Sequence, residues 1–185
     1  MASVLVPIAP GFEDIEAITI VDILRRAGIE VVTAGLGPGL VEGSRGTRVQ
    51  PDALLDEVLR RDFDMIALPG GMPGATHLRD DARVIAIIGR MAAAGLYTAA
   101  VCAAPIALEK AGVLAGKRAT SYPGFIDKLG LPDTICVDDP VVVDGKVVTS
   151  RGPGTAMDFA LMLVELLAGR DQRNQVEAGL MRPAN

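Results

Sequence analysis

An α/β fold with a mostly parallel, buried sheet is what this sequence predicts. Short runs rich in Val, Ile, Leu and Ala alternate with amphipathic segments, which is the pattern of β-α-β units. The chain has 185 residues, of which 50% are hydrophobic, enough for one sizeable core but few for two independent domains. We therefore expect a single domain over residues 1–185.

The strands are expected in short apolar runs. The last of these, VVVDGKVVTS, holds Asp144 and Gly145 between two Val-rich halves, the strongest short-range signal for a hairpin of antiparallel strands. The glycine-rich segment 35–49 is interpreted as a loop or an edge hairpin. The predicted strands are residues 4–9, 30–35, 63–70, 97–102, 118–121 and the C-terminal β-hairpin 141–150.

The segments between the strands carry helix signals. Residues 13–27 begin with acids, end with Arg25 and Arg26 and stop at Gly28, so the charges and the glycine suit the helix dipole. The apolar stripe of this helix is Ala17, Ile20, Val21 and Leu24. Further helices are predicted at 52–61, 81–94, 103–111 and 155–169, with a looser one around 171–180.

Charge and hydropathy exclude several classes of partner. The net charge is -5, and no basic run is interleaved with aromatic residues, so nucleic acid is not an expected partner. The longest weakly polar stretch, 96–108, is shorter than the roughly 20 residues of a membrane helix. The N-terminus lacks the positive region of a signal peptide. We expect a cytoplasmic protein that does not contact membranes.

The cysteines and the histidine indicate neither a disulfide nor a metal site. Cys102 and Cys136 are too far apart for a C-x-x-C pair, and we expect both to be reduced. Cys136 has no nearby base or helix start and is interpreted as structural or incidental. His77 has no second histidine or cysteine near it, so it is expected at the surface or in a loop, and neither metal nor cofactor is expected.

Cys102 ends the predicted strand 97–102, just before the predicted helix 103–111. Open α/β sheets bind ligands at the carboxyl ends of their strands. A thiol at a helix start faces the positive end of the helix dipole and unpaired backbone N–H groups, which favour the thiolate. Pro105 supports a helix start at this point. The alternative is that Cys102 is a small buried hydrophobic residue.

Two further features could serve that thiol. The turn GGMPG follows strand 63–70 at the same edge and could offer the N–H groups of Gly70 and Gly71 to an oxyanion, unless these glycines only make the turn. Glu16 lies one turn before Ile20 at the border of the apolar stripe, so its carboxyl is expected to face the sheet. Desolvation and a neighbouring thiolate would raise its pKa and favour a protonated carboxyl that donates to sulfur. Otherwise it only complements the helix dipole, as we interpret Glu13 and Asp14.

Four motifs, in this order and across nearly the whole chain, carry a family resemblance: GFEDIEA, ALPGG, AAVCAAP and TSRGPGTAMDFAL. Together they resemble the ThiJ/PfpI superfamily, in the branch of the parkinsonism-associated deglycase and its bacterial relatives. The resemblance implies a flavodoxin-like three-layer sandwich, a homodimer and a cysteine on a strained strand-to-helix elbow. It implies roles for the following residues: Cys102 as nucleophile, Glu16 as protonated partner, Gly70 and Gly71 as oxyanion donors, and Arg26 and Arg45 near the dimer interface.

Two positions depart from related patterns. Animal members have histidine in a T-x-H-P run where this chain has Tyr122, a weak general base at pH 7 that can still donate a hydrogen bond or line a pocket. Ala103 follows Cys102 where protease-like branches place a histidine, so a triad protease is disfavoured. The H-x-E run of glutamine amidotransferases is also missing. We expect Ala103, Tyr122 and Pro153 to line the substrate pocket.

Two functions of different class remain open. The first is a cysteine-dependent, cofactor-free enzyme of the glyoxalase III or protein deglycase type. It would act on methylglyoxal, glyoxal and their early adducts on amino acids and proteins, in defence against carbonyl stress. The second is an oxidative-stress sensor or chaperone, in which Cys102 is oxidised to a sulfinate held by Glu16 without turnover.

Overall fold

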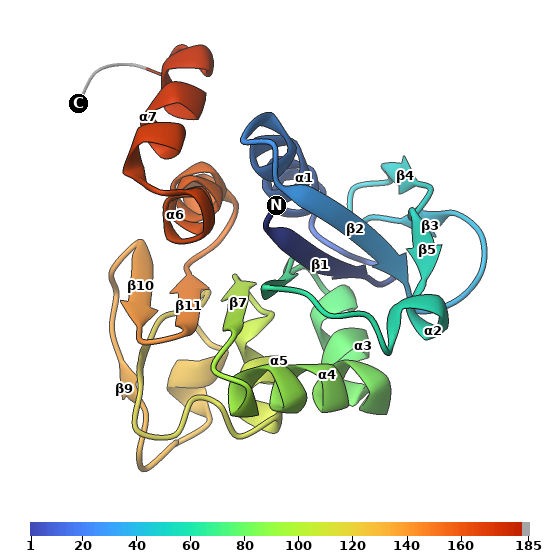
Figure 1. The fold of residues 1–185 in the computed structure, drawn as a ribbon. Helices are drawn as coiled ribbons and strands as arrows, with labels where there is room; N and C mark the ends of the chain where they lie inside the picture. Colours follow the sequence, from blue (N-terminus) through green and yellow to red (C-terminus); the bar gives the residue numbers. More distant parts are fainter. Residues whose placement is uncertain (183–185) are drawn as a thin grey trace.

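The computed structural model describes residues 1–182 and confirms an α/β fold with a mostly parallel central sheet (Figure 1). Seven strands form that sheet in the order β10-β11-β7-β6-β1-β2-β5, and every neighbouring pair is parallel except β10 with β11. The hairpin predicted at Asp144-Gly145 is that antiparallel pair. The strands are β1 Ser3–Ile8, β2 Glu30–Gly35, β5 Ala53–Leu54, β6 Met65–Leu68, β7 Tyr97–Val101, β10 Val141–Asp144 and β11 Val147–Ser150.

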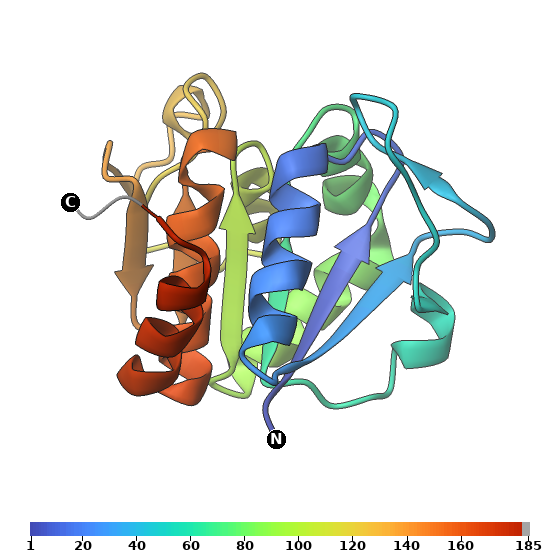
Figure 2. The ribbon, with the colours of Figure 1, turned by 90° about the horizontal axis from the view of Figure 1, so that it is seen from above.

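Helices cover both faces of the sheet, which gives the three layers that the sequence predicts (Figures 1 and 2). One face carries α1 (Asp14–Arg26), α6 (Ala156–Ala168) and α7 (Arg170–Gly179). The opposite face carries α3 (Gly74–Asp80), α4 (Ala82–Ala93) and α5 (Pro105–Lys110). No helix within residues 1–182 is long and apolar enough to cross a membrane.

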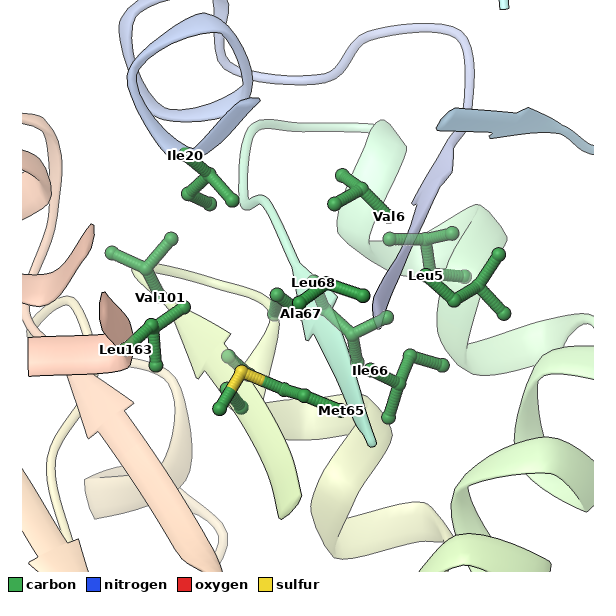
Figure 3. Close-up of a cluster of buried hydrophobic side chains, with 14 of the residues drawn as sticks. Leu5, Val6, Ile20, Met65, Ile66, Ala67, Leu68, Val101 and Leu163 are labelled. Carbon is green, nitrogen blue, oxygen red and sulfur yellow. The ribbon is translucent and has the colours of Figure 1, made fainter. Parts of the chain in front are cut away.

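The core fills the space between these layers (Figure 3). Val101, Met65 and their neighbours on the strands meet Ile20 of α1 and Leu163 of α6, and all are buried. The predicted stripe of α1 is right at Ala17, Ile20 and Leu24, but Val21 is only partly buried. Ile23 fills that place in the core.

The predicted helix 52–61 is wrong over its first residues. Ala53 and Leu54 form strand β5 at the sheet edge, and only Leu55–Val58 are helical (α2). The cause is Asp52, whose Oδ2 accepts hydrogen bonds from the Thr33 amide at 2.9 Å and the Thr33 hydroxyl at 2.7 Å. These bonds hold the segment in an extended conformation beside β2.

Three other segments differ in detail from the prediction. The glycine-rich segment 35–49 contains an antiparallel hairpin, β3 (Val41–Glu42) with β4 (Arg48–Val49), separate from the main sheet. The strand predicted at 118–121 is β8 (Arg118–Ala119), which pairs with β9 (Ile135–Cys136) in a small sheet of its own. The sequence also missed α3, which follows the GGMPG turn directly and carries His77 at its surface.

Candidate functional site

Cys102 lies at a strained elbow between β7 and α5. Its φ is +63°, in the left-handed region that non-glycine residues rarely adopt. Two backbone hydrogen bonds hold this geometry: its N–H donates to the Ser150 carbonyl at 3.0 Å, and its carbonyl accepts from Tyr122 N–H at 2.8 Å. Helix α5 then begins at Pro105. The strand-to-helix turn is therefore present, and the thiol lies at the carboxyl edge of the sheet.

Glu16 lies in the first turn of α1 and is fully buried, with 0% of its surface exposed. Glu13 caps the helix by accepting the Glu16 amide hydrogen at 2.9 Å. One carboxyl oxygen, Oε2, accepts the Gly70 N–H at 2.8 Å, while Oε1 has no partner among the described residues. Glu16 thus faces the sheet, as its position beside the apolar stripe predicts.

The pKa values of Glu16 and Cys102 depend on each other. Burial raises the pKa of Glu16 to about 7, against the hydrogen bonds from Gly70 and Cys102, which lower it. Burial, followed by the negative charge of Glu16, raises the pKa of the Cys102 thiol to about 12, while the Gly71 and Ala103 N–H groups act in the opposite direction. While Glu16 is ionised, its charge and burial therefore act against the thiolate that the sequence predicts at the helix start. α5 has only six residues, and burial outweighs it.

After the loss of its first proton, the pair carries one negative charge. When the proton lies on Glu16, the like charge disappears and the carboxyl can donate a hydrogen bond to sulfur. When it lies on sulfur, the carboxylate is the charged group. The first proton lost belongs to the pair and not to either residue.

Gly70 does not have the role that the sequence suggested. Its N–H is already donated to Glu16, so it is not free to bind an oxyanion. The N–H groups that stabilise a charge on the Cys102 sulfur are those of Gly71 and Ala103. The sequence predicts only that Ala103 lines the pocket, because a residue type does not indicate where its backbone N–H points.

Cys102 is 8% exposed, and this exposure opens into a pocket of about 420 Å³. The three predicted pocket residues, Ala103, Tyr122 and Pro153, all line it. The sequence missed several neighbours, of which Ser44 comes from the β3–β4 hairpin. The full lining is Glu13, Ser44, Arg45, Gly71, Met72, Cys102, Ala103, Tyr122, Phe125 and Pro153.

The chain matches a family model described as DJ-1/PfpI family over residues 2–166. The chain belongs to the DJ-1/PfpI family. This match confirms the resemblance seen in the motifs.

Named relatives extend this finding. "Protein dj-1beta" of Drosophila melanogaster is 43% identical over 180 residues, which cover 97% of this chain and 96% of the relative. "Protein DJ-1 homolog A" of Arabidopsis thaliana is 45% identical over 175 residues, 94% of this chain but only 44% of that longer protein. "Glutathione-independent glyoxalase DJR-1.2" of Caenorhabditis elegans is 36% identical over 164 residues, 89% of this chain and 87% of the relative.

Solved structures of the family have the same fold. The crystal structure of Drosophila melanogaster DJ-1beta matches with a TM-score of 0.94 at 43% identity and covers 99% of both chains. The structure titled "Toxoplasma gondii DJ-1, oxidized" matches with a TM-score of 0.94 at 41% identity and covers 100% of both.

In this DJ-1/PfpI chain Tyr122 lies at the pocket rim and is 49% exposed. Its ring meets Phe125 edge-to-face, with the centroids 6.4 Å apart. The backbone N–H of Tyr122 supports the elbow by binding the Cys102 carbonyl, a function that does not depend on the side chain. The backbone at this position therefore supports the elbow whichever side chain it carries.

The remaining sequence candidates lie elsewhere. His77 is exposed on α3, where its Nδ1 lies 3.0 Å from the Pro10 carbonyl oxygen. Cys136 is exposed on β9 and borders a different pocket, next to Ser121 and Arg151. Arg26 forms an ion pair with Asp22 on the surface of α1, whereas Arg45 lines the Cys102 pocket.

Gly70→Ala is expected to lower the free energy of unfolding by about 1–3 kcal/mol, because the added methyl overpacks the site. A Cβ at this position would lie 2.7 Å from the Cβ of Cys102 and 2.8 Å from Oε2 of Glu16. Gly89→Ala is the control, since its Cβ would meet nothing within 4 Å inside helix α4, and it should stabilise the protein by about 0.5–1 kcal/mol. Urea denaturation measures both, and equal effects of the two substitutions would contradict the packing described for Gly70.

Proposed function

We propose that this protein is a cofactor-free glyoxalase that converts methylglyoxal or glyoxal to the corresponding hydroxy acid. The observation that carries the proposal is a thiol at an open pocket beside a buried carboxyl whose pKa burial raises to about 7. A relative covering 89% of this chain bears the name glutathione-independent glyoxalase, which supports the same chemistry.

The first step is attack of the Cys102 thiolate on the aldehyde carbon. A carbon–sulfur bond forms while the carbonyl π bond breaks, and the oxygen becomes an alkoxide. The N–H groups of Gly71 and Ala103 face this side of the site and can stabilise the developing charge. The alkoxide then takes a proton from Glu16, which gives a neutral hemithioacetal and a carboxylate.

In the second step Glu16 acts as a base. A carboxyl with a pKa of about 7 can both donate and accept a proton at neutral pH. Glu16 takes the proton from the carbon bonded to sulfur while the neighbouring carbonyl oxygen is protonated, which gives an enediol. A proton then returns to the neighbouring carbon, the hydroxyl on the sulfur-bonded carbon loses its proton, and a thioester of the hydroxy acid is left on Cys102. Water hydrolyses this thioester and releases the acid and the thiol, so that the net reaction adds one water to the dicarbonyl.

The same residues can act on early adducts of dicarbonyls with Cys, Lys and Arg side chains. Attack by Cys102 on such an adduct would release the amino acid side chain, and water would complete the cycle. Deglycation of this kind is therefore part of the proposal, as a second substrate class for one mechanism.

Lactate formation from methylglyoxal tests the proposal. Purified protein in buffer without glutathione or metal should form one lactate for each methylglyoxal consumed, as measured by enzymatic lactate detection and loss of dicarbonyl. Consumption of methylglyoxal without lactate would mean simple trapping by the thiol. If methylglyoxal is not consumed and no lactate forms, the proposed enzyme activity is excluded.

A redox sensor is the second candidate, because a relative with the same fold has been solved under the description "oxidized". Two equivalents of peroxide would convert the Cys102 thiol to a sulfinic acid with release of two waters. Mass spectrometry of Cys102 at low peroxide separates the two functions: rapid oxidation without lactate formation favours the sensor.

A homodimer and a cytoplasmic location stay predictions from the sequence. Helix α1 exposes two large apolar side chains three residues apart, Ile15 and Ile18, next to its buried stripe. We propose this exposed stripe, together with Arg26, as the face that a second copy covers.

A further inference from the structure

The loop of residues 43–47 forms one wall of the Cys102 pocket. It joins β3 to β4 and contributes Ser44 and Arg45 to the lining. None of its residues is large and apolar, and most of them are exposed. Hydrophobic burial therefore does not hold this loop in place, and polar contacts must do so.

Asp14, two residues before Glu16, supplies those contacts. Its carboxylate is 9% exposed and accepts the Arg45 amide hydrogen at 2.9 Å and the Thr47 amide hydrogen at 3.0 Å, one on each oxygen. Gly43 packs directly on the carboxylate, since a Cβ there would lie 2.7 Å from both oxygens. The neighbouring backbone adds a bond from Ser44 N–H to the Phe12 carbonyl at 2.7 Å.

Asp14 is held as an anion by the loop. Burial alone would raise its pKa, but hydrogen bonds from Thr47 and Arg45 outweigh burial and lower the pKa below its ordinary value. Within residues 1–182 Asp14 makes no salt bridge. The backbone of the loop is thus the group that stabilises the charge, and the sequence-based interpretation of Asp14 as a helix-dipole residue is incomplete.

Arg45 is fixed at its backbone and free at its side chain. Within the described residues its guanidinium forms neither a salt bridge nor a hydrogen bond, although it lines the same pocket as Cys102. The only other charged residue of the lining is Glu13, whose carboxyl caps α1. The position of the one cation in this pocket therefore depends on how the loop is held.

We propose that Asp14 is a positioning residue, which holds the 43–47 loop so that the charge of Arg45 acts at the Cys102 thiol. The effect of this positioning on turnover depends on the proposed function. The geometry itself does not depend on that function and can be tested without a substrate.

The test compares two alkylating reagents of similar size, the anion iodoacetate and the neutral iodoacetamide. Rates of Cys102 alkylation are measured by mass spectrometry with Cys136→Ser as the background, because Cys136 is exposed. A cation within a Debye length of the thiol raises the rate of alkylation by the anionic reagent relative to the rate by the neutral reagent. Arg45→Gln should lower the ratio of the two rates by about three- to tenfold at low salt.

Asp14→Asn distinguishes positioning from a simple charge effect, because the two predict changes of opposite sign in the iodoacetate to iodoacetamide ratio. Asn offers one acceptor oxygen where two backbone N–H groups need two, so the loop loosens and the iodoacetate to iodoacetamide ratio should fall. If Asp14 acts only as a negative charge, removing it should raise the ratio. Asp22→Asn, an exposed carboxylate on the same helix, is the matched control and should leave the ratio unchanged.

Combining the variants completes the test. If Asp14 acts through Arg45, the iodoacetate to iodoacetamide ratio of the double variant Asp14→Asn with Arg45→Gln should be no lower than that of Arg45→Gln alone. Additive losses, or an unchanged or raised ratio in Asp14→Asn, would overturn the proposal. Should Asp14→Asn fail to fold, Gly43→Ala, which pushes a methyl against the carboxylate, is expected to lower the ratio in a folded protein. Absence of lactate formation in the wild type would exclude the glyoxalase activity, but it would not affect the conclusion about Asp14 and Arg45 drawn from the alkylation rates.

Discussion

Cys102→Ser is expected to lower the rate of lactate formation from methylglyoxal by at least about 100-fold. A serine hydroxyl does not ionise near neutral pH, so neither the shared proton nor the N–H groups of Gly71 and Ala103 can produce a nucleophile from it. The substitution replaces one sulfur by one oxygen, so the fold should be retained. Lactate production with an unchanged melting temperature measures the chemical effect alone.

Cys136→Ser is the control for that result. Cys136 is exposed on β9, outside the Cys102 pocket, and its loss should leave the rate unchanged. Residual activity in Cys102→Ser close to the wild-type rate would mean that another group carries out the reaction, and the site described above would not be the active site.

Glu16→Gln is expected to change the pH dependence of stability. The folded protein raises the pKa of this carboxyl from 4.5 to about 7, so between these two pH values the folded state binds more protons than the unfolded chain. Wild-type stability therefore falls as the pH rises from about 4.5 to 7. One pKa unit corresponds to about 1.36 kcal/mol, so the loss is up to about 3 kcal/mol.

Glutamine does not ionise, so the variant lacks this loss. Its free energy of unfolding relative to the wild type should rise by up to about 3 kcal/mol between pH 4.5 and pH 8, whatever the difference between the two proteins at pH 4.5. Urea denaturation at the two pH values measures this difference. A constant difference between variant and wild type would show that Glu16 is not desolvated in the folded protein.

The sequence was sufficient for the layers and for the elements that carry the site. Apolar runs with Val and Ile define buried parallel strands, and the Asp144-Gly145 turn defines the hairpin, because both patterns are local. The same holds for Cys102 and Glu16, each of which lies at a helix start that its neighbours mark. Asp52 shows why a prediction from local sequence can fail. A segment with a helical pattern forms a strand because Asp52 accepts hydrogen bonds from Thr33, which is distant in sequence.

The parts of the site that the sequence missed are backbone and packing effects. The sequence predicts that the Gly70 N–H binds an oxyanion, but in the structure it donates to Glu16, because a residue type does not indicate which acceptor its amide will meet. The sequence predicts only a helix-dipole role for Asp14, and it misses the amides of Arg45 and Thr47 because they lie about 30 positions later. The thiol pKa depends on burial, which only the complete fold determines.

The reactivity of Cys102 against pH tests most directly whether this thiol shares its proton with Glu16. Alkylation by iodoacetamide is measured in the Cys136→Ser background, with and without Glu16→Gln. We expect a half-maximal rate near pH 7 in the wild type, where the pair loses its first proton, and a shift to higher pH by about one unit or more in Glu16→Gln. A half-maximal rate at about pH 9 or above, unaffected by Glu16→Gln, would contradict it.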